Sequence, residues 1–168
     1  KAAEAAVPLL KGFAPDVVFT SEVYGDPFAA CLGCRHVSVD RARTAVPVSG
    51  TAVRADPLAH WEFLEPPVRG FYAKRVVLIG AESTGKTTLA ADLAAALRTV
   101  WVPEYGRTHW EEKVARGDTA GWTPDEFVHI AREQCKREDA AAREANRVLV
   151  CDTDAFATRV WYRRYMNT

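Results

Sequence analysis

"VVLIGAESTGKTTLAADLAAAL", residues 76–97, decides the fold of the second half of the chain. The four apolar residues Val76–Ile79 predict a buried strand, and the alanine- and leucine-rich run Thr88–Leu97 predicts a helix. The loop between them fits the pattern G-x-x-x-x-G-K-[ST] at every fixed position. Because it joins a strand to a helix, which is the context that this pattern requires, we predict that the loop binds the phosphates of a nucleotide.

The residue types in this loop suit phosphate chemistry. Glycine lets backbone amides approach phosphate oxygens without a Cβ in the way, and the start of the helix offers unpaired N–H groups. Lys86 supplies a charge for the β- and γ-phosphates and is a predicted catalytic residue, while Thr87 offers a hydroxyl to Mg²⁺. The predicted phosphate-binding residues are Gly80, Glu82, Ser83, Thr84, Gly85, Lys86, Thr87 and Thr88.

Acidic residues follow the predicted strand Val148–Cys151. Asp152 is placed to hold Mg²⁺ together with Thr87, and we count it among the catalytic candidates. Asp154, two residues later, is a candidate on the substrate side. The alternative interpretation of Asp152 is that it caps the next helix, which aspartate does well at such a junction.

A second polar group, Glu104-Tyr105-Gly106-Arg107, follows the predicted strand Thr99–Val102. In an open α/β sheet, ligands bind beyond the carboxyl ends of the strands. Glu104 is a candidate for accepting the proton of an acceptor hydroxyl, Arg107 for steadying phosphate charge, and Tyr105 for the substrate side. The alternative is a surface ion pair beside a turn. Three tryptophans could stack on an aromatic ligand, but we favour packing in the core or at its rim and do not count them as site residues: Trp101, Trp110 and Trp122.

Strands and helices alternate along the rest of the chain. In the first half, the sequence predicts a strand from Asp16, a helix over Gly25–Leu32 that ends at Gly33, and a strand over His36–Asp40. Residues 41–72 are interrupted by prolines. In the second half, the sequence predicts a helix over Tyr105–Arg116 and a helix capped by Thr123 that runs to about Asn146. The alternation predicts an α/β fold, with a parallel sheet and helices on both of its faces.

Composition excludes some classes of function. The chain has 22 basic and 22 acidic side chains, so a basic nucleic-acid-binding surface is not expected in this region. No apolar run approaches the roughly 20 residues of a membrane helix. The pair Cys31 and Cys34 has the CxxC spacing of a metal or redox site, but we favour small packing residues at the end of a helix in a reducing cytoplasm.

In this order, the motifs resemble those of the NadR-type bifunctional nicotinamide-nucleotide adenylyltransferase and ribosylnicotinamide kinase family. The resemblance spans nearly the whole chain from about Asp16. It is carried by Val48-Ser-Gly-Thr-Ala-Val-Arg54, Pro57, Trp61, Val68-Arg69, Phe71-Tyr72, "GAESTGKTT", "EYGR" and "CDTDAFAT" at residues 151–158.

The resemblance implies a Rossmann-like adenylyltransferase domain that ends within residues 1–72, followed by the first part of a P-loop kinase domain in residues 73–168. The first domain would transfer AMP from ATP to nicotinamide mononucleotide, giving NAD, and the second would phosphorylate ribosylnicotinamide with ATP and Mg²⁺. In the first domain the resemblance assigns the ATP phosphates to Ser49, Gly50, Thr51 and Arg54. Whether Glu104 or Asp152 is the kinase base stays open, as does the oligomeric state.

The sequence also departs from the family pattern. It has no H-x-G-H-type loop, and its kinase half ends at Thr168 without a later segment for a phosphate lid and an adenine pocket. We therefore expect an internal fragment, incomplete at both ends, that is inactive or weakly active by itself. Two alternatives stay open: a generic P-loop nucleoside or nucleotide kinase behind an unrelated domain, and a nucleotide-sensing regulator without catalysis.

Overall fold

The computed structural model describes residues 14–167, which form two compact units. One unit ends at Val53 and the other begins at Arg54, whereas the sequence places the domain boundary after Tyr72. Residues 54–72 pack with the second unit, where the Trp61 indole N–H donates to the Ala145 carbonyl at 3.2 Å. The assignment of residues 1–72 and 73–168 to two enzyme domains stays a prediction.

The first unit contains two parallel strands joined by a helix. Strands β1 (Val17–Thr20) and β2 (Arg35–Ser38) pair with Val18 opposite His36, and α2 (Gly25–Leu32) connects them. Helix α2 ends at Gly33, whose φ of 68° is the left-handed cap predicted from the sequence. Strand β2 ends before the predicted Asp40, because the Asp40 carboxylate accepts backbone N–H groups of the turn that follows.

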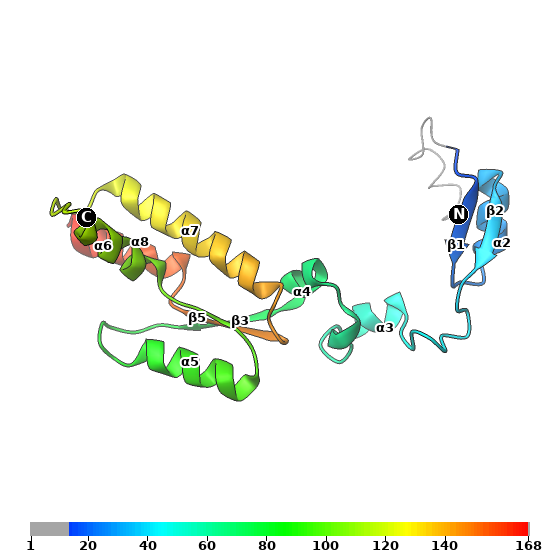
Figure 1. Ribbon diagram of the computed structural model, residues 1–168, viewed down its shortest axis with the longest axis horizontal. Coiled ribbons are helices and arrows are strands. Elements are labelled where there is room, and N and C mark those ends of the chain that lie inside the picture. Colours follow the sequence, from blue (N-terminus) through cyan, green and yellow to red (C-terminus); the bar gives the residue numbers. More distant parts are fainter. Residues whose placement is uncertain (1–13, 168) are drawn as a thin grey trace. The chain divides into compact units, whose positions relative to one another are not determined.

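The second unit is built around a three-stranded parallel sheet in the order β3-β5-β4. Figure 1 shows α5 on one face of this sheet and α7 on the other, so the predicted architecture is confirmed. The elements after β2 are α3 (Gly50–Ala55), which spans the division between the units, the 3-10 helix η2 (Trp61–Phe63), α4 (Pro66–Tyr72), β3 (Lys74–Leu78), α5 (Lys86–Leu97), β4 (Trp101–Val102), α6 (Tyr105–Ala115), α7 (Pro124–Ala142), β5 (Val148–Asp152) and α8 (Ala155–Met166).

The core of this unit lies on the two faces of β5. Leu149 and Cys151 face α7 and pack with Val102 and with Ala142 of that helix. Val150 points to the opposite face, where small alanines of α5 let the helix approach closely. All three β5 residues are fully buried, which explains the unbroken apolar run of a central parallel strand.

Several element boundaries differ from the predicted ones. Strand β3 spans Lys74–Leu78 and not Val76–Ile79, and Ile79 is 78% exposed because it already belongs to the phosphate loop. Strand β4 is shorter, because the Thr99 hydroxyl accepts the backbone N–H of Asn146 and donates to the Val148 carbonyl. Helix α7 ends at Ala142, since the chain must turn through Arg147, whose φ is 65°, to enter β5. Its start is confirmed: Thr123 and Glu126 form a reciprocal capping box.

The structure also bears on the predictions about the cysteines and about membrane-spanning segments. Cys31 lies within α2 and Cys34 just after its cap, and both are free thiols, as are Cys135 and Cys151. Within residues 14–167, no helix is long and apolar enough to cross a bilayer. The cytoplasmic location stays a prediction.

Candidate active site

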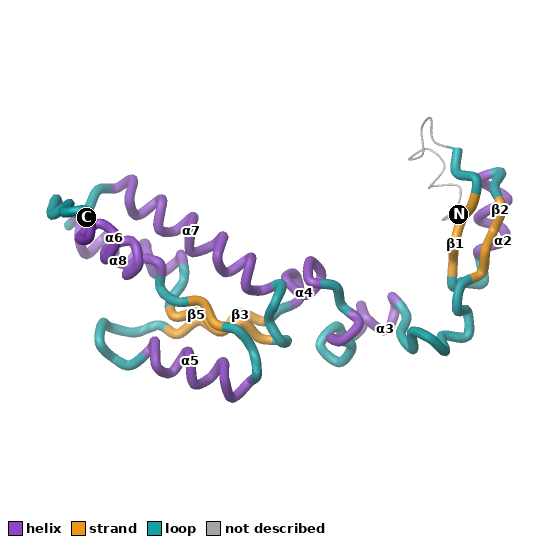
Figure 2. Tube along the Cα trace, in the orientation of Figure 1, coloured by secondary structure: helices purple, strands orange, loops and turns teal. Residues whose placement is uncertain are grey.

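The loop between β3 and α5 has the geometry that phosphate binding requires. Figure 2 shows it as a loop at one end of the sheet. Gly85 has a φ of 84°, which permits the turn into α5, and the first turn of that helix has no side-chain cap. The Lys86 ammonium and the Thr84 hydroxyl both donate to the Ala81 carbonyl, at 2.7 and 2.8 Å. The amides at the start of α5 therefore face no competing side chain.

Asp152 and Thr87 form a pair beside this loop, as the sequence predicts. The Thr87 hydroxyl donates to Asp152 Oδ2 at 2.5 Å, and the Asp152 side chain is buried. The other oxygen, Oδ1, is buried with no hydrogen-bond partner, a condition that only Arg69 Nε shares in the described part of the chain. A carboxylate oxygen with unused lone pairs next to a hydroxyl fits Mg²⁺, which prefers oxygen ligands.

Glu104 lies at the N-cap position of α6, directly after the short segment that follows β4. Its side chain does not cap the helix. Burial raises the pKa of this carboxyl, as does the charge of Asp152, while Arg107 and Lys86 act in the opposite direction. A carboxylate with a raised pKa at the carboxyl end of a strand is suited to accept a proton.

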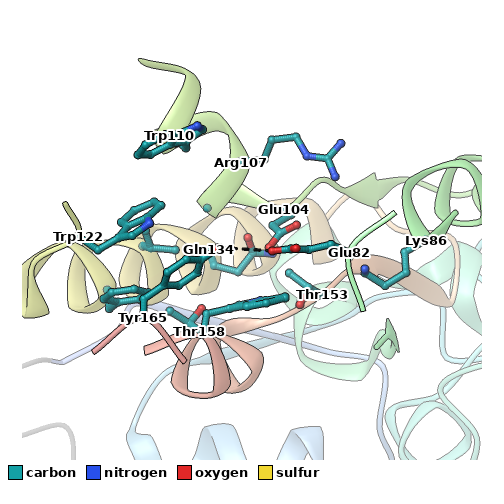
Figure 3. A pocket seen from close by; sticks show the side chains of 14 residues that line it. Glu82, Lys86, Glu104, Arg107, Trp110, Trp122, Gln134, Thr153, Thr158 and Tyr165 are labelled. Carbon is teal, nitrogen blue, oxygen red and sulfur yellow. Dashed lines mark hydrogen bonds between the residues drawn. The ribbon is translucent and has the colours of Figure 1, made fainter. Parts of the chain in front are cut away.

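Lys86 and Glu104 line one cleft of about 440 Å³, whereas Thr87 and Asp152 are not among its lining residues. Figure 3 shows the charged side chains Lys86, Glu82 and Glu104 at one end, and Trp122 and Tyr165 at the other. The Tyr165 hydroxyl donates to Glu82 Oε1 at 3.4 Å and so links α8 to the phosphate loop. The lining residues are Glu82, Lys86, Glu104, Gly106, Arg107, Trp110, Trp122, Phe127, Ile130, Gln134, Thr153, Thr158, Trp161 and Tyr165.

The aromatic end of the cleft was missed by the sequence-based interpretation. Trp110 and Trp122 were interpreted as packing residues, yet both line the cleft, with ring centroids 5.3 Å apart. Trp101, by contrast, packs against the α5 face of the sheet, as interpreted. A tryptophan that lines a ligand site and one that packs in a core look the same in sequence. The only indication that Trp110 and Trp122 line the site was that they follow β4 in the chain.

Not every predicted substrate-side residue reaches the cleft. Arg107 lines it. The Tyr105 ring is buried against α7, where its hydroxyl is 3.1 Å from His129 Nε2 and the Arg137 guanidinium covers its face. Asp154 caps α8 by accepting the Ala157 N–H at 2.8 Å. Tyr105 and Asp154 are therefore not among the residues that line the cleft.

The predicted adenylyltransferase residues lie around the start of α3. Gly50 is its first residue, Thr51 its second, and Arg54 lies in its last turn. The Ser49 hydroxyl accepts the Ala52 N–H at 3.1 Å and so caps the helix. Their role in binding ATP stays a prediction.

The sequence of the chain is similar to those of known proteins. The chain is 33% identical over 156 residues to the "Trifunctional NAD biosynthesis/regulator protein NadR" of Escherichia coli (strain K12) and, equally, to the protein of that name from Salmonella typhimurium (strain LT2). The match covers 92% of this chain and 38% of each relative, so the chain spans well under half the length of these relatives. The resemblance to NadR proteins is confirmed.

Solved structures show the same fold. A crystal structure of NadR protein in complex with NAD and AMP-PNP matches with a TM-score of 0.70, and one in complex with NR with 0.71. Each is 24% identical in sequence, and the match covers 97% of this chain and 48% of the other. A family model described as an AAA domain matches residues 75–168, which contain the phosphate loop, the Thr87–Asp152 pair and the cleft. This chain therefore belongs to the AAA domain family.

Proposed function

We propose that this chain is part of a bifunctional enzyme of NAD biosynthesis. Residues 73–168 would form the first part of a ribosylnicotinamide kinase, and residues 1–72 the end of a Rossmann-like nicotinamide-nucleotide adenylyltransferase. The observation that carries the kinase proposal is the cleft that joins residues of the phosphate loop to a wall of aromatic side chains. Its lining residues Lys86 and Thr153 directly neighbour the Thr87–Asp152 pair in sequence. The likeness to NadR proteins supports the choice of substrates.

The charged end of the cleft suits Mg-ATP. The amides at the start of α5 and the Lys86 ammonium would hold the β- and γ-phosphates, with Lys86 exchanging the Ala81 carbonyl for a phosphate oxygen. Thr87 and the unpartnered oxygen of Asp152 would hold Mg²⁺, which neutralises phosphate charge when it is bound. Because Asp152 is committed to this pair, Glu104 is the better candidate for the base.

The aromatic end suits the acceptor riboside. A flat, positively charged pyridinium ring is attracted by the faces of tryptophan and tyrosine, such as those of Trp122 and Tyr165. The 5′-hydroxyl would then point to Glu104 at the charged end. The hydroxyl oxygen forms a bond to the γ-phosphorus, the bond from that phosphorus to ADP breaks, and the hydroxyl proton passes to Glu104. Arg107 would balance charge on the transferred group.

The adenylyltransferase proposal rests on the similarity of residues 48–72 to NadR proteins. Ser49, Gly50, Thr51 and Arg54 would hold the phosphates of a second ATP, with nicotinamide mononucleotide as acceptor and NAD as product.

The test uses the full-length protein that contains this sequence, as wild type and as Lys86→Ala. Each is incubated with Mg-ATP and either nicotinamide riboside or nicotinamide mononucleotide, and the products are separated by chromatography. Wild type is expected to make NAD from both compounds. Lys86→Ala is expected to make NAD only from the mononucleotide, because its phosphate loop is disabled while the other site is untouched.

Each contrary result is informative. If wild type binds ATP but does not phosphorylate nicotinamide riboside, the kinase proposal fails. Phosphorylation of other nucleosides in its place would indicate a generic nucleoside kinase, and no phosphorylation at all would indicate a sensor. If neither protein makes NAD from the mononucleotide, the adenylyltransferase proposal fails.

A further inference from the structure

The start of helix α6 is capped by a residue from a different helix. The Tyr105 N–H is the first of the amides that have no partner within α6, and it lies one position before the two amides that an N-cap side chain reaches. Here the N-cap residue is Glu104, which makes no capping hydrogen bond. Instead, Gln134 Oε1 of α7 accepts the Tyr105 N–H at 2.9 Å, and Gln134 is 1% exposed.

This hydrogen bond fixes the peptide group that joins Glu104 to Tyr105. A carboxylate at an N-cap is normally attracted back to the amides of its own helix. Gln134 thus holds the peptide group directly after Glu104, and the Glu104 side chain lines the cleft instead of capping α6. Arg107 lies on the same first turn of α6.

The orientation of the Gln134 amide is fixed by a buried network. Gln134 Nε2 donates to Glu138 Oε1 at 3.1 Å, and Arg75 of β3 donates to Glu138 Oε2 at 3.0 Å. Turning the Gln134 amide over would place N–H groups against the Tyr105 N–H and an oxygen against the Glu138 carboxylate. The network therefore links the central sheet to the first residue of α6.

We propose that Gln134 is a positioning residue, which caps α6 from α7 and thereby aims Glu104 and Arg107 at the reacting atoms. This inference rests on the proposed kinase function. Gln134 also lines the cleft, so a role in binding the riboside directly is the rival explanation. The two roles differ in kinetics: misaimed catalytic groups lower kcat, whereas a lost substrate contact raises KM.

The test compares three variants of the full-length protein with wild type. Gln134→Leu removes the acceptor and keeps the approximate volume. Gln134→Glu combined with Glu138→Gln exchanges the two side chains. The glutamate at position 134 can still accept the Tyr105 N–H. The glutamine at position 138 can donate to that glutamate and accept from Arg75. Ala142→Gly destabilises the same helix at a buried position outside the network and serves as the control.

Two readouts are measured for each variant at a temperature at which all are folded. The first is kcat and KM for phosphorylation of nicotinamide riboside. The second is hydrogen exchange of the Tyr105 amide by NMR, which does not depend on activity. Gln134→Leu is expected to lower kcat by about 10- to 100-fold with little change in KM for the riboside, and to speed the exchange of Tyr105. The double exchange is expected to restore both, and Ala142→Gly to change neither.

Several results would overturn the proposal. A raised KM for the riboside with unchanged kcat in Gln134→Leu would make Gln134 a binding residue. Unchanged exchange of the Tyr105 amide, or no recovery in the double variant, would show that the cap has no such role. If wild type phosphorylates no riboside, the proposed function fails by itself, and the exchange of Tyr105 alone decides whether Gln134 holds α6.

Discussion

At the scale of single residues, Glu104 makes the most direct prediction about chemistry. A base must be deprotonated, and burial raises the pKa of Glu104 above its ordinary value of 4.5. Activity should therefore be lost as the pH falls through this raised pKa, so the acid limb of the rate profile lies above 4.5. Glu104→Gln is expected to lower kcat by about 10²- to 10⁴-fold.

The measurement is the pH profile of riboside phosphorylation by wild type and variant. Glu111→Gln, an exposed position on the same helix, is the control and should keep the wild-type profile. An acid limb that persists unchanged in Glu104→Gln would assign it to another group and would return Asp152 to consideration as the base.

Asp152→Asn tests the magnesium assignment. The variant keeps an oxygen that can accept from Thr87 but loses the charge at the oxygen that has no partner. The Mg²⁺ concentration for half-maximal activity is expected to rise about 10- to 100-fold, as for the loss of one charge-assisted contact of ~1.5–3 kcal/mol. Titration of activity with Mg²⁺ measures this. Asp92→Asn, exposed on α5, should leave the titration unchanged.

At the scale of elements, the connection between α6 and α7 depends on a buried lysine. Lys113 is 2% exposed and donates to Glu126 Oε1 at 2.8 Å and to the Gly121 carbonyl at 3.1 Å. Burial by itself would raise the pKa of Glu126, but hydrogen bonds from Lys113, Thr123 and His109 outweigh it and lower the pKa to about 2. The charged pair therefore holds the segment that carries Trp122.

Glu126→Gln should destabilise this arrangement. Glutamine keeps the capping box, but the buried Lys113 ammonium loses its nearer carboxylate and keeps only Asp118 Oδ2 at 3.7 Å, which costs about 1–3 kcal/mol. Since the folded-state pKa of Glu126 is lowered, its contribution is present above its ordinary value of 4.5 and is lost as the pH falls toward 2. Urea unfolding at pH 7 should separate wild type from variant, and the difference should shrink at pH 3.

Glu133→Gln, an ion-pair residue on the same helix, provides the comparison and should cost well under 1 kcal/mol, because its partner Lys136 is exposed. A variant Glu126→Gln as stable as wild type at pH 7 would refute the role of the pair.

The sequence predicted the elements better than the contacts between them. Local signals placed the phosphate loop, the cap at Gly33 and the capping box at Thr123, because each is decided by a few neighbouring residues. Strand β4 and the end of α7 were misplaced, since the Thr99 hydroxyl contacts residues near β5 that lie far along the chain.

Within the site, the sequence located the charged end but not the aromatic end or the Gln134 network. The burial of Gln134 and Glu138 could have been predicted, because both lie on the buried stripe of α7 that begins with Phe127 and Ile130. Polar residues on a buried stripe need partners. Their partners, Tyr105 and Arg75, could not be predicted from the sequence, because both lie far from them along the chain.

At the scale of the whole molecule, residues 54–72 decide where the second unit begins. Trp61 is 4% exposed and its indole N–H is bonded to Ala145. Trp61→Ala is expected to cost about 3–5 kcal/mol. Hydrogen exchange should then speed up in the sheet of residues 74–152 and stay unchanged in residues 14–53. Phe71→Ala, at a side chain that is 81% exposed, should have little effect. Equal loss of protection in both units would show that they unfold together.

The position of β5 has a consequence for biosynthesis. In the sheet of residues 74–152, β3 and β4 pair with β5 and not with each other, although β5 is the last of the three strands to be made. On a ribosome that adds about 5–20 residues per second, β3 emerges seconds before its partner. During that interval β3 has no partner strand, and its exposed edge can bind chaperones or other nascent chains. The nucleotide site thus first becomes possible when Val148–Asp152 emerges from the ribosome.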